Sequence, residues 1–78
     1  YFDYRLEEVS LWLIAGEFQT AIDAGEALIK ELPDNADAYR LLGIAYGELK
    51  NKTKAISYLN KAKQLGDTSV ESFMKKYQ

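Results

Sequence analysis

Residues 36–65, ADAYRLLGIAYGELKNKTKAISYLNKAKQL, decide the fold. The first half carries apolar residues at the i, i+3, i+4, i+7 spacing of one helical stripe, and the second half carries another stripe rich in alanine. The polar break Lys50-Asn51-Lys52 separates them. The stretch therefore predicts two helices joined by a short turn. The two stripes consist of Tyr39, Leu42, Gly43 and Tyr46, and of Ala55, Ile56, Leu59, Ala62 and Leu65.

Turn signals divide the rest of the chain in the same way. Pro33-Asp34-Asn35 and Gly66-Asp67-Thr68 are strong breaks, and Ala15-Gly16-Glu17 is a softer one. Asp34 and Thr68 each precede a predicted helix as a side-chain acceptor, with an acid three residues later near the positive end of the helix dipole. The sequence thus predicts five helices. Their expected ranges are 3–15, 18–31, 35–49, 53–65 and 69–77.

Composition excludes several classes of function. The 78 residues include 10 basic and 12 acidic side chains, no His and no Cys. A nucleic-acid-binding protein normally has a basic excess, and a membrane helix needs roughly 20 consecutive apolar residues, so we expect neither partner. Without His or Cys, the serines have no imidazole to activate them, and no thiolate or imidazole metal site exists. We expect no catalytic residues, no metal and no cofactor.

Similar residues recur in the two halves of the chain at a constant spacing. This spacing equals the distance along the sequence between the predicted helix starts at Asp34 and Thr68. Residue class is kept at this offset more than residue identity, because few positions are literally the same. The sequence therefore predicts two copies of one helical unit. The matched pairs include Trp12 with Tyr46, Ala21 with Ala55, and Ile22 with Ile56.

The unit at residues 36–67 resembles a tetratricopeptide repeat, a helix–turn–helix of about 34 residues. Tyr39, Leu42-Gly43 and Tyr46 stand at the family's first-helix positions, and Ala55, Leu59 and Ala62 at its second-helix positions. Residues 2–35 match more loosely, through Trp12, Gly16, Phe18, Ala21, Ile22 and Pro33. The resemblance implies an all-α fold of tandem antiparallel helix–turn–helix repeats, an α-solenoid.

We interpret residues 1–78 as one domain, with a divergent first repeat at 2–35, a second repeat at 36–69, and a capping helix or truncated third repeat at 70–78. Three family positions are changed in the first repeat, where Arg5 replaces an aromatic residue, Glu8 a leucine and Val9 a glycine. The helix at 3–15 is therefore expected to be either an exposed end or a repacked one. The last helix turns polar after Phe73, as a solvated cap would.

Gly43 supports this interpretation on physical grounds. A glycine inside a helix costs about 1 kcal/mol relative to alanine, so a compensating contact is expected. Small residues at Gly43, Ala55 and Ala62 would let paired helices approach closely. Gly43 and Gly47 also form a Gly-x-x-x-Gly pair, and the charged residues on the same helix favour packing in a soluble protein over a membrane seam.

The resemblance implies a concave face lined by the first helix of each repeat. In this chain that surface is predicted to include several apolar side chains, which would suit a partner helix or an extended peptide. The alternative is that the same side chains pack against neighbouring helices. The residues expected on this face are Asp3, Leu6, Ser10, Leu13, Asp37, Arg40, Leu41, Ile44, Gly47 and Lys75.

One specialised use of the family's groove is not expected here. Members that clamp the terminal carboxylate of chaperones use Lys, Asn and Arg at five positions, and in this chain only Lys75 fits. The other four positions hold Leu6, Ser10, Leu41 and Glu71.

The sequence therefore predicts a soluble, non-catalytic protein-interaction module. No targeting segment is recognisable, and the sequence does not name the compartment, although the cytoplasm is slightly favoured. Two alternatives stay open: a self-assembling segment of a longer array, and an accessory domain of a larger protein. Residues 1–35 have a net charge of −6 and residues 36–78 of +4, which would suit weak head-to-tail association.

Overall fold

The computed structural model describes residues 4–78, and these residues form five α-helices. Each helix end lies within one residue of the position expected from the sequence. The predicted all-α fold is therefore confirmed, and the described residues contain no strand. The helices are α1 (Tyr4–Ile14), α2 (Phe18–Glu31), α3 (Ala36–Glu48), α4 (Lys52–Gln64) and α5 (Val70–Tyr77).

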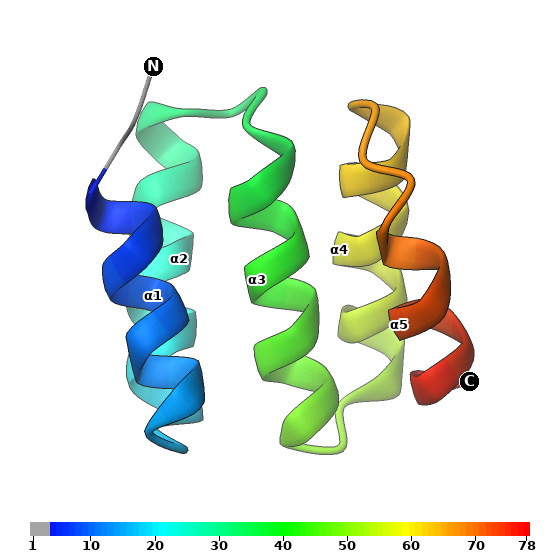
Figure 1. Cartoon of the computed structure of the whole chain (residues 1–78), viewed down its shortest axis with the longest axis horizontal. Coiled ribbons are helices and arrows are strands. Elements are labelled where there is room, and N and C mark those ends of the chain that lie inside the picture. Colours follow the sequence, from blue (N-terminus) through cyan, green and yellow to red (C-terminus); the bar gives the residue numbers. More distant parts are fainter. Residues whose placement is uncertain (1–3) are drawn as a thin grey trace.

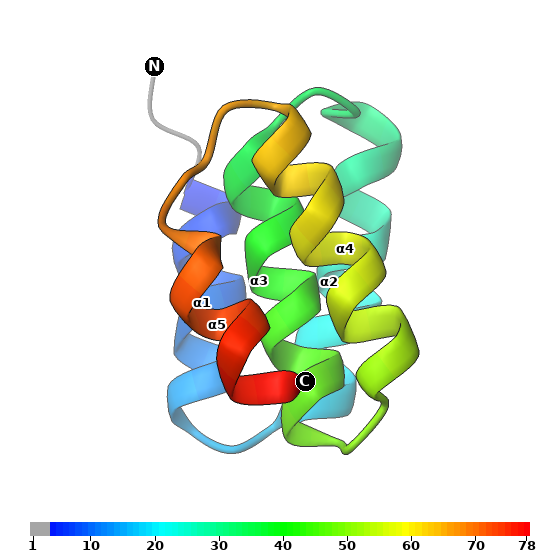
Figure 2. The same ribbon diagram turned by 90° about the vertical axis from the view of Figure 1, so that its right-hand side faces the viewer.

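The helices form two antiparallel hairpins, α1–α2 and α3–α4, followed by α5. Figure 1 shows α1, α3 and α5 on one side of the molecule, with α2 and α4 behind them. In Figure 2, turned by a quarter, α1 and α5 lie to the left of α3, and α2 and α4 lie to its right. The backbone of α3 is thus set back between α1 and α5 on the face that these three helices share, which we term the hollowed face. The molecule measures 30 × 26 × 17 Å.

The core has two parts that meet at the central hairpin. The first cluster joins α1, α2 and α3, and the second joins α4 and α5 with side chains of α3 at its edge. Because α3 contributes to both, it is the most deeply buried helix. The fully buried large side chains are Val9, Ile22, Leu42, Leu59 and Val70.

Gly43 of α3 lies in close contact with α4. A Cβ atom at Gly43 would lie 2.6 Å from Leu59 Cγ and 3.1 Å from the carbonyl oxygen of Ala55. Ala55 and Ala62 are also completely buried. The expected role of these three small residues, to allow close helix approach, is therefore confirmed.

The residues that immediately precede α3 and α5 differ by one position from those expected. Asn35, rather than Asp34, caps α3, because its side chain accepts a hydrogen bond from the Ala38 amide at 3.2 Å. Ser69, rather than Thr68, precedes α5 and makes no side-chain capping bond. In α4 the cap is Asn51, which accepts from the Lys54 amide at 3.2 Å.

Candidate functional site: the face of α1, α3 and α5

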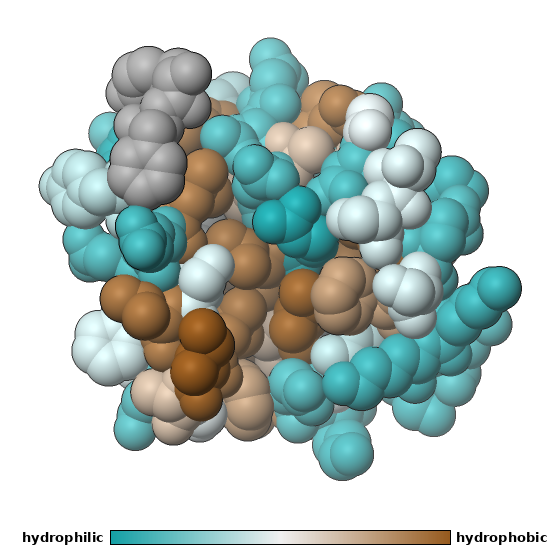
Figure 3. Space-filling view, viewed as in Figure 1, coloured by the Kyte–Doolittle hydropathy of each residue, from teal (hydrophilic) through white to brown (hydrophobic). Residues whose placement is uncertain are grey.

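Most of the residues predicted for partner binding belong to α1, α3 and α5, the helices of the hollowed face. Asp3 lies outside the described residues. The remaining residues predicted on α1 are Leu6, Ser10 and Leu13, all half-buried, and Lys75 on α5 is exposed. Figure 3 shows hydrophobic surface running between α1 and α3, bordered by hydrophilic side chains toward the N-terminal end of α3 and toward α5.

Three apolar side chains form what we term the apolar strip: Leu6, Leu13 and Ile44. Leu6 and Leu13 pack against the first core cluster, so the alternative of packing between neighbouring helices accounts for part of their surface. They nevertheless keep part of their surface exposed, as does Ile44 on α3. Two of its three side chains are therefore anchored to the core, and all three stay partly accessible.

Two predicted residues do not lie on an open surface. Leu41 is only 6% exposed and belongs to the first core cluster. Gly47 is covered by the ring of Tyr77, since a Cβ atom at Gly47 would lie 2.5 Å from that ring. The expectation that both face a partner is corrected here, because α3 is contacted from both sides by other helices of this chain.

The last helix is also less solvated than expected. Tyr77 packs over Gly47 and is 6% exposed, and Val70 at the start of α5 is completely buried. The two glycines of the Gly-x-x-x-Gly pair therefore receive side chains from two different helices, Leu59 from α4 and Tyr77 from α5.

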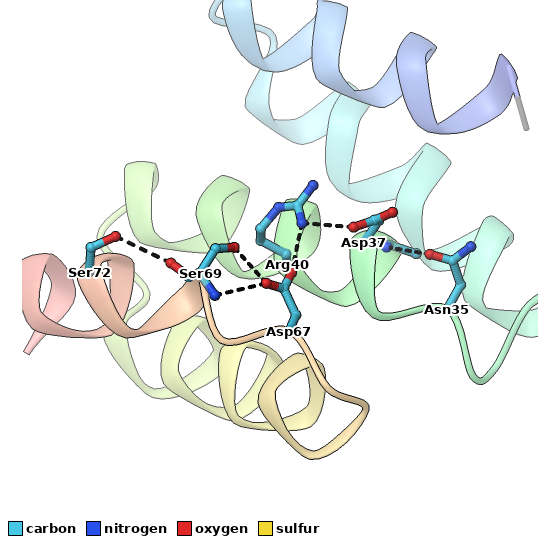
Figure 4. Close-up of polar contacts among 7 residues, drawn as sticks. Asn35, Asp37, Arg40, Asp67, Ser69 and Ser72 are labelled. Carbon is cyan, nitrogen blue, oxygen red and sulfur yellow. Dashed lines mark hydrogen bonds and ion pairs between the residues drawn. The ribbon is translucent and has the colours of Figure 1, made fainter. Parts of the chain in front are cut away.

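Charged side chains occupy the end of the face where α3 begins (Figure 4). The Arg40 guanidinium donates from Nη1 to Asp37 Oδ1 and to Asp67 Oδ2, each at 2.7 Å. Asp67 is the more buried of the two carboxylates, with its side chain 11% exposed. Arg40 therefore ties the first turn of α3 to the loop that precedes α5.

The loop end of this network is fixed by Ser69. Its amide donates to Asp67 Oδ1 at 3.0 Å, and its hydroxyl donates to the same oxygen. Burial alone would raise the pKa of Asp67, but the hydrogen bonds from Ser69 and Arg40 outweigh it and hold the pKa below its ordinary value. The carboxylate thus stays ionised, and Arg40 keeps a fixed position beside the apolar strip.

Sequence reasoning misses one contact of this region. The pairing of Asp67 with Arg40 has no local sequence signal, because the two residues are 27 positions apart. The exposure of Leu11, Trp12 and Ile14 on α1 agrees with one of the two expectations for this helix, that of an exposed end. A stripe that recurs from one repeat to the next predicts burial only where a neighbouring helix is present.

Two features are absent from the described part of the chain. Residues 4–78 contain no group of three or more His, Cys, Asp or Glu side chains placed to hold a metal ion. None of their helices has the length and hydrophobicity that crossing a bilayer requires.

Comparison with known proteins gives one finding. A family model for the tetratricopeptide repeat matches residues 13–71, which includes α2, α3 and α4 and leaves out most of α1. No match was found among curated proteins or among solved structures.

Proposed function

Because the chain belongs to the tetratricopeptide repeat family, whose members are in general protein-interaction modules, we propose that it binds a partner helix or extended peptide on the hollowed face of α1, α3 and α5, without catalysis. The observation that carries this proposal is the apolar strip of Leu6, Leu13 and Ile44, whose side chains stay partly exposed.

The strip alone would give only weak binding. Complete burial of a Leu or Ile side chain contributes about 1.5–3 kcal/mol, and these three are already partly covered, so each adds about 1 kcal/mol on contact. A micromolar complex needs about 8 kcal/mol net of the entropic cost of association. The partner must therefore also use polar groups of the face.

Arg40, Asp37 and Lys75 are the proposed polar contacts. Both carboxylate bonds of Arg40 use the same nitrogen, Nη1, so its other N–H groups can still donate to a partner carbonyl or carboxylate. Their direction is set in advance, which reduces the entropy lost on binding. Lys75 lies exposed on α5. These groups would set the orientation of a chain lying along the strip.

The test compares Ile44→Glu with Leu11→Glu, an equally drastic change at an exposed residue that lies outside the strip on α1. Proteins captured by the wild type and lost by Ile44→Glu are identified, and their affinity is then measured by calorimetry. We expect Ile44→Glu to weaken binding at least tenfold and Leu11→Glu to change it less than twofold, with unchanged circular dichroism for both. Equal binding by wild type and Ile44→Glu would refute the proposal.

A concentration series in light scattering tests the self-assembly alternative. If the hollowed face serves a separate partner, the protein stays monomeric at high concentration. A mass that rises with concentration and falls to that of a monomer in Ile44→Glu would instead assign the strip to self-association.

A further inference from the structure

The side of α1 that points away from α3 carries a second apolar surface. Figure 1 shows α1 at one end of the row of helices, with α3 on one side only. Four side chains at i, i+3, i+4 and i+7 line a pocket of about 280 Å³, and all four come from α1 and the residue that follows it. We term this surface the outer stripe. It consists of Glu8, Leu11, Trp12 and Ala15.

The matching surface of α3 is covered within this chain. Leu11 is 57% exposed, whereas Ala45, its counterpart one repeat later, is completely buried. Trp12 is 41% exposed, whereas its counterpart Tyr46 is half-buried and packs against the first core cluster. Residues 4–78 provide no helix that covers the outer stripe as α2 covers α3.

The contact of α2 with α3 shows what such a helix would look like. Gly25 of α2 lies against the side chain of Leu42, where a Cβ atom would be only 2.9 Å away. Glu26, next in α2, accepts a hydrogen bond from the Tyr46 hydroxyl at 3.1 Å. By analogy, a helix that covers the outer stripe would have small and apolar residues where it crosses α1. It would also have a hydrogen-bond acceptor or other polar group near Trp12, the counterpart of Tyr46.

The negative charge of α1 beside the outer stripe indicates which residues a docking helix needs on its flank. Glu8 occupies the register of Leu42, which is completely buried, and Glu7 lies next to it on the exposed surface. Covering a carboxylate without a cationic partner is costly. A helix that docks on the outer stripe must therefore bring Lys or Arg to Glu8.

A second copy of this chain does not meet these requirements. The exposed residues of α4 and α5 are all polar, and those of α2 are polar except for Ala27, so these helices offer no apolar stripe. Pairing α1 with another α1 would bring two sets of Glu7 and Glu8 together, while the cation of α1, Arg5, is already paired with Glu31.

We propose that the outer stripe docks an amphipathic helix of another polypeptide, with small and apolar residues at the crossing and basic residues on its flank. This site is independent of the hollowed face, and its failure would leave the proposed function untouched.

Trp12 provides the measurement, because it is the only tryptophan of the chain. The probe is a stapled peptide with the sequence of residues 18–31 and the changes Asp23→Lys and Glu31→Lys. Both positions are exposed on α2, so the changes leave its packing side intact. The matched control is the same stapled peptide without these changes, which is acidic.

We expect the basic peptide to shift the Trp12 emission to the blue in a saturable way, with binding weakened by salt. Affinity should fall at least tenfold for the acidic peptide and for the Leu11→Glu protein, and change less than twofold for Ile44→Glu. Amide shifts in NMR spectra should map to α1.

Three outcomes would overturn the proposal. The first is no saturable change up to millimolar basic peptide, and the second is equal affinity for the two peptides or for the Leu11→Glu protein. The third is a blue shift of Trp12 that appears without peptide as the protein concentration rises, because the stripe would then be covered by a second copy. Circular dichroism checks that Leu11→Glu is folded, as expected for an exposed position.

Discussion

The two hairpins share one pattern but differ in their neighbours. The α3–α4 hairpin has α2 on one side and α5 on the other, whereas α1–α2 has a described neighbour on one side only (Figure 1). Equivalent residues consequently differ in burial, as Ala45 and Leu11 do. In a repeat protein, burial is therefore set by the adjacent unit as much as by the residue itself.

The hairpins also distribute side-chain size differently at one pair of matched positions. The second hairpin has Gly43 on its first helix and Leu59 on its second, in direct contact. At the matching positions the first hairpin has Val9 and Gly25. Val9 is buried, so the loss of glycine from α1 did not expose this position. A large and a small residue occupy the two positions in both hairpins, in opposite order.

The largest effect is expected when this order is broken. Gly43→Val places a branched side chain where even a Cβ would lie 2.6 Å from Leu59 and 3.1 Å from a backbone oxygen. Overpacking a core costs about 1–3 kcal/mol, and backbone contact places this case near 3 kcal/mol. Urea unfolding followed by circular dichroism measures the loss.

A second-site change tests the same contact. Adding Leu59→Ala to Gly43→Val should cost less than Leu59→Ala costs in the wild type, because space is then available for the valine. Purely additive free energies would show that the two positions do not interact, and the comparison of the hairpins would lose its basis.

The turns that follow the two hairpins are closed in different ways. After the first, the Tyr39 hydroxyl donates to the carbonyl oxygen of Pro33 at 2.9 Å. After the second, Asp67 stands at the position of Pro33 and binds Arg40 and Ser69. The contact that closes the second turn is an ion pair, whereas the contact that closes the first is a hydrogen bond between uncharged groups.

Asp67→Asn should therefore destabilise the protein by about 1–2 kcal/mol, because a partly buried guanidinium loses its ionic partner. The pKa of Asp67 is lowered in the folded protein, so the carboxylate stabilises the fold above its unfolded pKa of about 4. This contribution is lost as the pH falls below about 4, through the lower folded pKa. The stability difference between wild type and variant should shrink over that range in urea titrations. A difference independent of pH would contradict the charge-based closure.

Sequence reasoning predicted the helices well because their determinants are local. Gly16, Asn51 and the i, i+4 stripes act within a few residues, and the role of Gly43 follows from its cost inside a helix. The candidate site was less predictable because its key contacts are between repeats. Leu41 and Gly47 match groove positions by register, but their burial depends on contacts that lie outside α3, and for Gly47 the covering side chain is Tyr77 of α5.

The turns inside the hairpins offer a smaller, matched comparison of helix starts. Asn51 caps α4, whereas Glu17, at the same position of the first hairpin, makes no capping bond to α2. Asn51→Ala should cost about 1 kcal/mol, and Glu17→Asn should stabilise by a somewhat smaller amount. Thermal unfolding of the two variants measures both. A loss of stability in Glu17→Asn would show that the first turn cannot accept the cap geometry of the second.

The residue before each cap is expected to give the smallest effect. Gly16 and Lys50 occupy this position with φ of 81° and 68°, and only glycine adopts such a conformation without strain. Lys50→Gly relieves the strain, but it also increases the entropy of the unfolded chain and removes a cation from the negative end of α3. We expect a net gain of about 0.5 kcal/mol in urea unfolding.

Salt separates these opposing contributions, since screening weakens only the interaction of Lys50 with the helix end. The gain from Lys50→Gly should therefore increase in high salt. The control Lys30→Gly, in the last turn of α2, should destabilise at both salt concentrations, because a glycine in a helix relieves no strain there. If Lys50→Gly also destabilised the protein, the strain at Lys50 would be smaller than the entropic cost of glycine, and the two turns would be equivalent despite their different residues.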